Sequence, residues 1–236
     1  MKAILKREWA GYFHTGLGFL FLFVFSALSG IIFYLNNLLP RSSDMGGFFA
    51  LVSYQWVLLA PILTMRLLPS DKTNSTQPLL MSAPVSMSAI VSAKYLSALM
   101  MLLAALLLSF VYPLIILFYG KLYLPEILTG YLGLFLYGAA YLAVDMLVSA
   151  FTKKAASAFV LALGVNLLLR LAGLIASGIR LRALSSVLSF FDLEKRYTPF
   201  VFGQMSFASL LYYVLVALTC LVCTVQAMNM KRWSRT

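Results

Sequence analysis

Hydrophobic residues along this chain gather in six long blocks, separated by short polar or charged segments. The blocks lie at about 17–35, 48–68, 95–119, 127–151, 155–177 and 206–228. A helix needs about 20 consecutive apolar residues to cross the hydrocarbon core of a bilayer, and each block is about that long. The pattern therefore predicts an all-α polytopic membrane protein with six transmembrane helices.

The composition excludes a soluble enzyme and a disordered chain. The 236 residues are 62% hydrophobic and 11% charged, whereas a soluble domain is about 45–50% apolar and about 25% charged. A soluble protein of this length has no interior large enough to hide so much apolar surface. We therefore expect a single transmembrane domain over residues 1–236.

The basic residues predict how the chain is oriented. There are 18 Lys and Arg against 7 Asp and Glu, which gives a formal net charge of +11. With a cytoplasmic amino terminus, eleven basic residues lie inside, six lie outside and Arg170 lies within a block, as the positive-inside rule favours. The inner group is Lys2, Lys6, Arg7, Arg66, Lys72, Lys94, Lys153, Lys154, Lys231, Arg232 and Arg235. We expect a plasma-membrane protein with both termini in the cytoplasm, in contact with membrane lipid and not with nucleic acid.

Three polar segments predict structure outside the spans. Residues 1–14 interleave basic and aromatic side chains, which favours a helix lying in the cytoplasmic interface, although a simple basic flank is the alternative. The cytoplasmic loop 69–94 turns amphipathic after Pro78, which suits the first turn of a short helix. The outer segment 178–205 is too apolar for a free loop, so we expect short amphipathic or partly re-entrant helices there.

The motifs of common enzyme chemistry are missing from the sequence. It contains no phosphate-binding GxxxxGK[ST] and no HExxH, and its single histidine, His14, falls at the membrane interface. Cys220 and Cys223 form a CxxC pair, but they lie inside an apolar block with no second ligand pair, so ordinary core or lipid-facing residues are the better interpretation. We expect no catalytic, metal-binding or cofactor-binding residues in this chain.

Two ionisable residues fall inside predicted spans and are the default candidates for function. Asp145 lies in the fourth block, and it either has a functional role or snorkels toward Lys153 and Lys154. Arg170 lies in the fifth block, and it either faces a polar path or a partner subunit, or snorkels outward. Their depths differ by roughly 12 Å at 1.5 Å per residue, so we do not expect them to pair.

Glycines recur at short spacings in three places, which favours close helix packing over a nucleotide-binding loop. The three pairs are Gly16/Gly18, Gly130/Gly133 and Gly173/Gly178.

The stretch 64–95 resembles the membrane subunits of ABC transporters of the ABC-2 class, in particular the gliding-motility and copper-processing branch. The matching residues are Thr64-Met65-Arg66, then Leu79-Leu80-Met81-Ser82-Ala83-Pro84-Val85-Ser86, then Ile90-Val91-Ser92-Ala93-Lys94-Tyr95. The pattern Phe190-Phe191, Phe200, Gly203 and Tyr212-Tyr213 is also similar to this branch. Ser70-Asp71 stands where the family has two acidic residues, Ser75 where it has glycine, and Pro78 where it has glutamate.

The resemblance implies a permease that moves an unidentified substrate, in the export direction, through the interface of two permease chains. The second chain is the same or a different one. The family's coupling helix would fall in the 70–84 loop and dock on a separate ATP-binding subunit, present in two copies, which binds ATP and Mg. The coupling residues it implies are Ser70, Asp71, Lys72, Ser75, Thr76, Leu79, Leu80 and Met81.

Two other classes stay open. A six-span channel or secondary transporter would act without ATP, and the small number of intramembrane charges counts against it. A membrane-embedded enzyme or assembly scaffold is the third, although an enzyme would need convergent polar groups.

Overall fold

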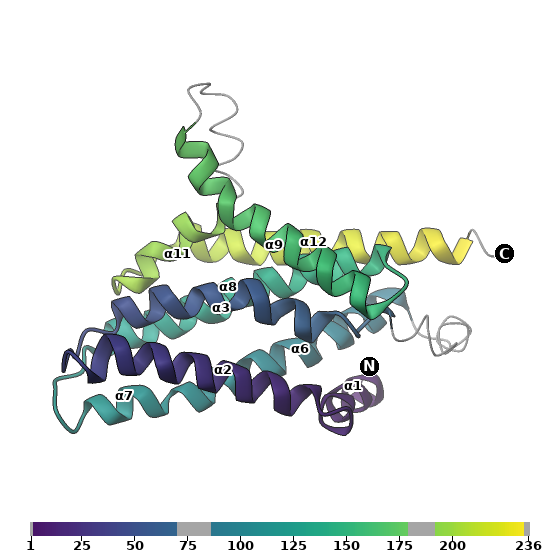
Figure 1. Cartoon of the computed structure of the whole chain (residues 1–236). Helices are drawn as coiled ribbons and strands as arrows, with labels where there is room; N and C mark the ends of the chain where they lie inside the picture. The colour runs from purple at the N-terminus through teal and green to yellow at the C-terminus, as the bar shows by residue number, and fades with distance from the viewer. Residues whose placement is uncertain (1, 70–85, 179–191, 234–236) are drawn as a thin grey trace.

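Helices form nearly all of the described structure. The computed structural model describes residues 2–69, 86–178 and 192–233, of which 84% are helical, and no strand occurs in these ranges. The helices are α1 (Lys2–His14), α2 (Leu17–Phe33), the π-helical turn η1 (Tyr34–Leu38), α3 (Gly46–Thr64), α6 (Met87–Ser109), α7 (Val111–Ile116), α8 (Leu124–Phe151), α9 (Ala155–Gly178), α11 (Leu193–Val201) and α12 (Phe207–Trp233). Figure 1 shows the long helices running side by side as a bundle.

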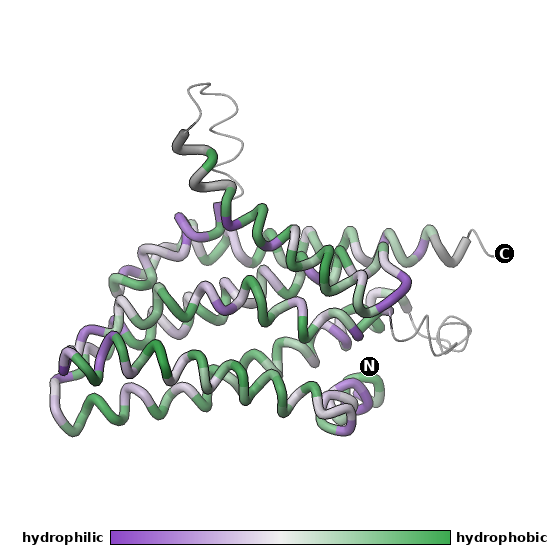
Figure 2. Tube along the Cα trace, in the orientation of Figure 1, coloured by the Kyte–Doolittle hydropathy of each residue, from purple (hydrophilic) through white to green (hydrophobic). Residues whose placement is uncertain are grey.

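Five stretches of the described chain are long and apolar enough to cross a membrane. They are Leu17–Leu38, Gly46–Thr64, Met87–Ile116, Leu124–Phe151 and Phe207–Met230. Helix α9 contributes a shorter apolar stretch, Ala155–Leu171, and its carboxyl-terminal part turns away from the bundle in Figure 1. Figure 2 shows hydrophobic residues along most of the bundle and hydrophilic ones gathered toward its ends and on α1. The length and apolar composition of these helices therefore indicate a multi-pass membrane protein.

The third long helix begins earlier than the sequence analysis predicts. It starts at Met87, because the Ser86 hydroxyl accepts a hydrogen bond from the Ala89 N–H at 3.3 Å and so caps the first turn. The prediction of a loop over 69–94 is therefore wrong for its last eight residues, 87–94. The predicted coupling residues, from Ser70 to Met81, lie outside the described residues.

Helix α8 lies at the centre of the bundle and packs against α3, α6, α9, α11 and α12. Two of its glycines permit this close approach. A Cβ added at Gly130 would lie 2.4 Å from the Phe49 ring, and one added at Gly133 would lie 2.6 Å from the Phe200 Cβ. The prediction of a packing role is confirmed for this pair.

The other two glycine pairs behave differently. Gly16 has a φ of +72° with open space around its Cα, so it serves the turn between α1 and α2 and not close packing. Its partner Gly18 does pack, since an added Cβ would lie 3.1 Å from the Tyr12 carbonyl oxygen. The surroundings of Gly173 and Gly178 lie outside the described part of the structure.

Helix α1 packs at the end of the bundle where both termini lie (Figure 1). The Lys94 Nζ donates to Glu8 Oε1 at 3.0 Å and also to the carbonyl oxygen of Leu67. The Tyr12 hydroxyl donates to the Leu63 carbonyl oxygen at 2.9 Å. Lys94, one of the inner group of basic residues in the sequence, is fully buried, and its ammonium pairs with a carboxylate from the amino-terminal helix.

Candidate functional site

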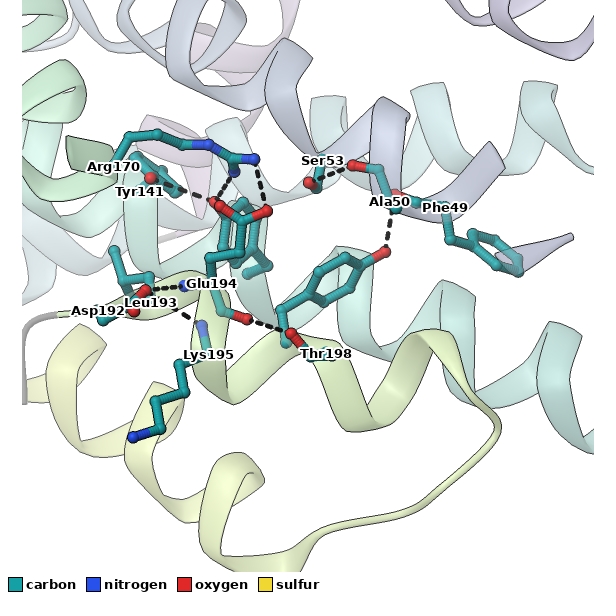
Figure 3. A network of polar contacts seen from close by, with 12 residues as sticks. Phe49, Ala50, Ser53, Tyr141, Arg170, Asp192, Leu193, Glu194, Lys195 and Thr198 are labelled. Carbon is teal, nitrogen blue, oxygen red and sulfur yellow. Dashed lines mark hydrogen bonds and ion pairs between the residues drawn. The ribbon is translucent and has the colours of Figure 1, made fainter. Parts of the chain in front are cut away.

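A guanidinium held inside the helix bundle is the centre of the candidate site. The Arg170 side chain, on α9, is only 9% exposed. Its Nη2 pairs with Glu194 Oε1 at 2.6 Å, and its Nη1 donates to the Tyr137 hydroxyl at 2.7 Å. Figure 3 shows the Arg170 side chain reaching toward the Glu194 carboxylate on the neighbouring α11. A guanidinium fits this task because its fork-shaped donors can bind two acceptors at once.

Aromatic side chains complete the surroundings of this cation. The guanidinium carbon of Arg170 lies 3.5 Å from the centre of the Tyr54 ring, a close cation–π contact. The hydroxyls of Tyr137 and Tyr141 lie 3.3 Å apart. Tyr54 is 53% exposed, so one side of the site opens to the surface of the chain. Helices α3, α8, α9 and α11 each supply part of the site.

Four hydrogen bonds hold α11, and with it Glu194, in place. Asp192 Oδ1 accepts hydrogen bonds from the N–H groups of Glu194 at 3.0 Å and Lys195 at 3.1 Å, which caps the helix. The Tyr197 hydroxyl donates to the Phe49 carbonyl oxygen at 3.1 Å, and the Tyr213 hydroxyl donates to the Leu193 carbonyl oxygen at 2.7 Å. The predicted amphipathic outer segment is therefore helical in its described part, with Leu193, Tyr197 and Phe200 buried.

The charge state of Glu194 reflects two opposing effects. Burial raises the pKa of its carboxyl above the usual value, and the neighbouring Arg170 guanidinium acts in the opposite direction. The Arg170 side chain does not extend outward to solvent, because Glu194 on α11 lies beside it and forms an ion pair with its guanidinium. The arrangement offers a fixed positive group beside aromatic rings, which suits binding and positioning more than covalent chemistry.

Asp145 lies in a separate polar contact deeper in the bundle. It is fully buried, and its Oδ2 accepts a hydrogen bond from Asn166 Nδ2 at 3.3 Å. The same amide nitrogen lies 3.3 Å from the Val57 carbonyl oxygen. Asp145 Oδ1 has no hydrogen-bond partner in the described structure. The alternative in which Asp145 snorkels toward Lys153 and Lys154 is wrong, because its carboxyl is fully buried and contacts Asn166 on α9.

Asp145 and Arg170 do not share a partner. The carboxyl contacts Asn166, while the guanidinium contacts Glu194 and Tyr137. The expectation that they do not pair is met among the described residues. Sequence reasoning did not identify Glu194 or Asn166, since an asparagine in an apolar helix and an acid in an outer loop carry no motif. The only available signal was the scarcity of acids, seven in the whole chain.

Within the described ranges, no three His, Cys, Asp or Glu side chains gather in an arrangement suited to a metal ion. Cys220 and Cys223 are free cysteines, the first half-buried and the second exposed. The helices and the buried polar contacts thus define a helical multi-pass membrane protein with a cation enclosed between its helices. No protein-family model matches the chain, and no curated protein matches it.

Proposed function

We propose that this chain is the membrane-spanning permease subunit of an ATP-driven transporter of the ABC-2 class. The observation that carries the proposal is the arrangement around residues 64–95, the stretch that resembles this class. Helix α3 ends at Thr64 and α6 begins at Met87, both at the end of the bundle that also holds the two termini (Figure 1). A soluble partner that approached this end would meet α1 and the segment between α3 and α6 together.

The contacts at this end supply a route for mechanical coupling. The Lys94–Glu8 ion pair and the Tyr12–Leu63 hydrogen bond join α1 to both helices that flank the segment. In the proposal, residues 70–84 form the coupling helix, and two copies of an ATP-binding subunit hold ATP and Mg. Closure of those subunits on ATP displaces the segment and tilts α3 and α6. A path for export then opens between two permease chains, identical or different.

The proposal also fixes the membrane placement of the chain. In the proposal, helix α9 is the fifth of six crossings, α1 lies in the cytoplasmic interface, and both termini are in the cytoplasm of a plasma-membrane protein. ATP hydrolysis belongs to the partner subunit, so this chain contributes no catalytic residues of its own.

Purification of the full chain from its own membrane with a mild detergent tests the proposal. An ATPase that carries a phosphate-binding loop should be recovered with the tagged chain. Scrambling residues 70–82 should remove both the ATPase and the ATPase activity, because these residues form the docking surface. The matched control replaces Lys153 and Lys154 with serine, since these exposed lysines lie outside the docking segment, between α8 and α9, which connect at the same end of the bundle in Figure 1.

Two results would contradict the proposal. One is a scrambled chain that inserts normally and still retains the ATPase at the wild-type level. The other is a wild-type preparation that contains no ATPase of this kind at all.

A channel or secondary transporter is the second candidate, and the Asp145–Asn166 contact is the observation that favours it. A buried carboxyl with one oxygen lacking a partner in the described structure is the kind of group that proton- or cation-coupled transporters use. The chain reconstituted alone in liposomes would then move protons or cations without ATP, and Asp145→Asn would abolish the flux. No flux above that of protein-free liposomes excludes this candidate.

A further inference from the structure

An open groove runs along one side of the bundle, and its lining includes Leu169 and Leu193, the chain neighbours of Arg170 and Glu194. It has a volume of about 560 Å³ and lies between α8, α9, α11 and α12. Helices α9 and α12 both pack on α8 but share few contacts with each other within the described residues, which leaves the space between them. Its walls are almost entirely apolar, from Val144, Val165 and Leu169 on one side to Leu211, Leu215 and Val216 on the other.

The length of the groove matches one leaflet of a bilayer. Along α12 its lining runs from Ala208 to Cys220, which is roughly 18 Å at 1.5 Å per residue. Half of a hydrocarbon core of about 30 Å is roughly 15 Å. Leu211 and Leu215 are more than half exposed on this wall, so a hydrophobic ligand can enter from the membrane side. A groove of this length and polarity fits an extended acyl chain.

A cation marks the end of the groove that lies farthest from the termini. Arg196, on α11, lines the groove beside Leu193, and its guanidinium carbon lies 5.3 Å from the centre of the Tyr212 ring. None of the described acidic side chains forms an ion pair with Arg196. Guanidinium groups bind phosphate oxygens well, and tyrosines are enriched at the headgroup level of membranes.

We propose that this groove is a binding site for a phospholipid, with one acyl chain between α9 and α12 and the phosphate diester on Arg196. The arrangement of an apolar groove as long as one leaflet, with a guanidinium at the level where the headgroup lies, favours a lipid over a helix from a second copy of the chain. The proposal depends on the chain lying in a membrane and not on its association with an ATPase.

Delipidated full chain in detergent, titrated with phosphatidylglycerol and followed by native mass spectrometry, tests the phosphate contact. Diacylglycerol with the same acyl chains is the phosphate-free probe. Arg196→Gln should weaken phosphatidylglycerol binding about tenfold or more and leave diacylglycerol binding unchanged, because a charge-assisted contact is lost. Lys195→Gln is the matched control, since it removes the same charge one residue away at an exposed position whose side chain extends away from the Arg170–Glu194 contact in Figure 3. An equal effect of Arg196→Gln on both lipids, or no effect on either, overturns the proposal.

A second pair of measurements tests the acyl-chain contact. Val216→Trp fills the groove and should abolish binding of both lipids, while the thermal unfolding midpoint stays at the wild-type value. A photo-reactive side chain at position 215 should cross-link to lipid in membranes. Unchanged lipid binding by the Val216 variant, or cross-linking of position 215 to a second copy of the chain, overturns the proposal.

Discussion

Every acidic side chain that the structure describes accepts at least one hydrogen bond from another residue. Glu8 pairs with Lys94, and Glu194 pairs with Arg170. Asp44 accepts from the Gly46 N–H at 2.8 Å, and Glu126 accepts from the Met45 N–H at 3.0 Å, so both fix the start of α3. The others in this group are Asp145 and Asp192. The few acids of this chain thus all take part in contacts that fix helix ends or pair with buried groups.

The Arg170–Glu194 pair predicts different results for two substitutions at one position. Glu194→Leu removes the acceptor and leaves a charged donor of Arg170 without it, so the free energy of unfolding should fall by about 1–3 kcal/mol. Glu194→Gln keeps an oxygen that can accept from the guanidinium, so its effect should be smaller. Thermal unfolding of the purified chain in detergent compares the two, with Lys195→Gln as the surface control. Equal destabilisation by leucine and glutamine would contradict the role of the acceptor.

The raised pKa of Glu194 predicts a pH dependence of stability. In the folded chain this carboxyl keeps its proton to a higher pH than the ordinary value of 4.5. Stability from this group is therefore complete below 4.5 and declines as pH rises through the raised pKa. The unfolding midpoint of the wild type should fall relative to that of Glu194→Gln over this range. A pH-independent difference between the two proteins would contradict the prediction.

At the scale of helices, the sequence predicts the long apolar elements well because bilayer thickness constrains their length. Five of the predicted spans coincide with helices that are long and apolar enough to cross a membrane. The sequence pattern predicts the third span to begin at residue 95, but α6 begins at Met87. The polar residues within 87–94 hide this start in a hydrophobicity pattern, whereas the Ser86 cap allows the helix to include them. Tertiary contacts such as Arg170 with Glu194 were also missed, because they depend on how α11 folds back and not on any local pattern.

The packing of α8 predicts the effect of adding a single methyl group. Gly133→Ala should destabilise the chain by about 1–3 kcal/mol, because the new Cβ would lie 2.6 Å from Phe200 and overpacking shifts α11. Gly164→Ala on α9 is the matched control, since its Cβ would meet nothing within 4 Å and should be tolerated. Unfolding midpoints of the two variants in detergent give the comparison. A Gly133 variant as stable as the Gly164 variant would show that α8 and α11 are not in such close contact.

For the whole molecule, both termini lie at one end of the bundle, and the proposal that this end is cytoplasmic predicts which positions face each side of the membrane. In a chain with Cys220 and Cys223 replaced by alanine, Lys121→Cys and Lys195→Cys should react with a membrane-impermeant maleimide in intact cells. Lys153→Cys should react only after permeabilisation, because it lies at the end that holds the termini. Labelling of Lys195→Cys that requires permeabilisation would mean that α9 does not cross, and that the chain has five spans.

The Lys94–Glu8 contact determines when, during synthesis of the chain, α1 can form its ion pair. Its two residues are 86 positions apart, so α1 has no ionic anchor until Lys94 has been synthesised. At 5–20 residues per second the delay is roughly 5 to 20 s, during which the first two spans emerge. The contacts of the amino-terminal helix are thus completed in two steps, first the Tyr12–Leu63 hydrogen bond to the second span and then the Lys94–Glu8 ion pair to the third.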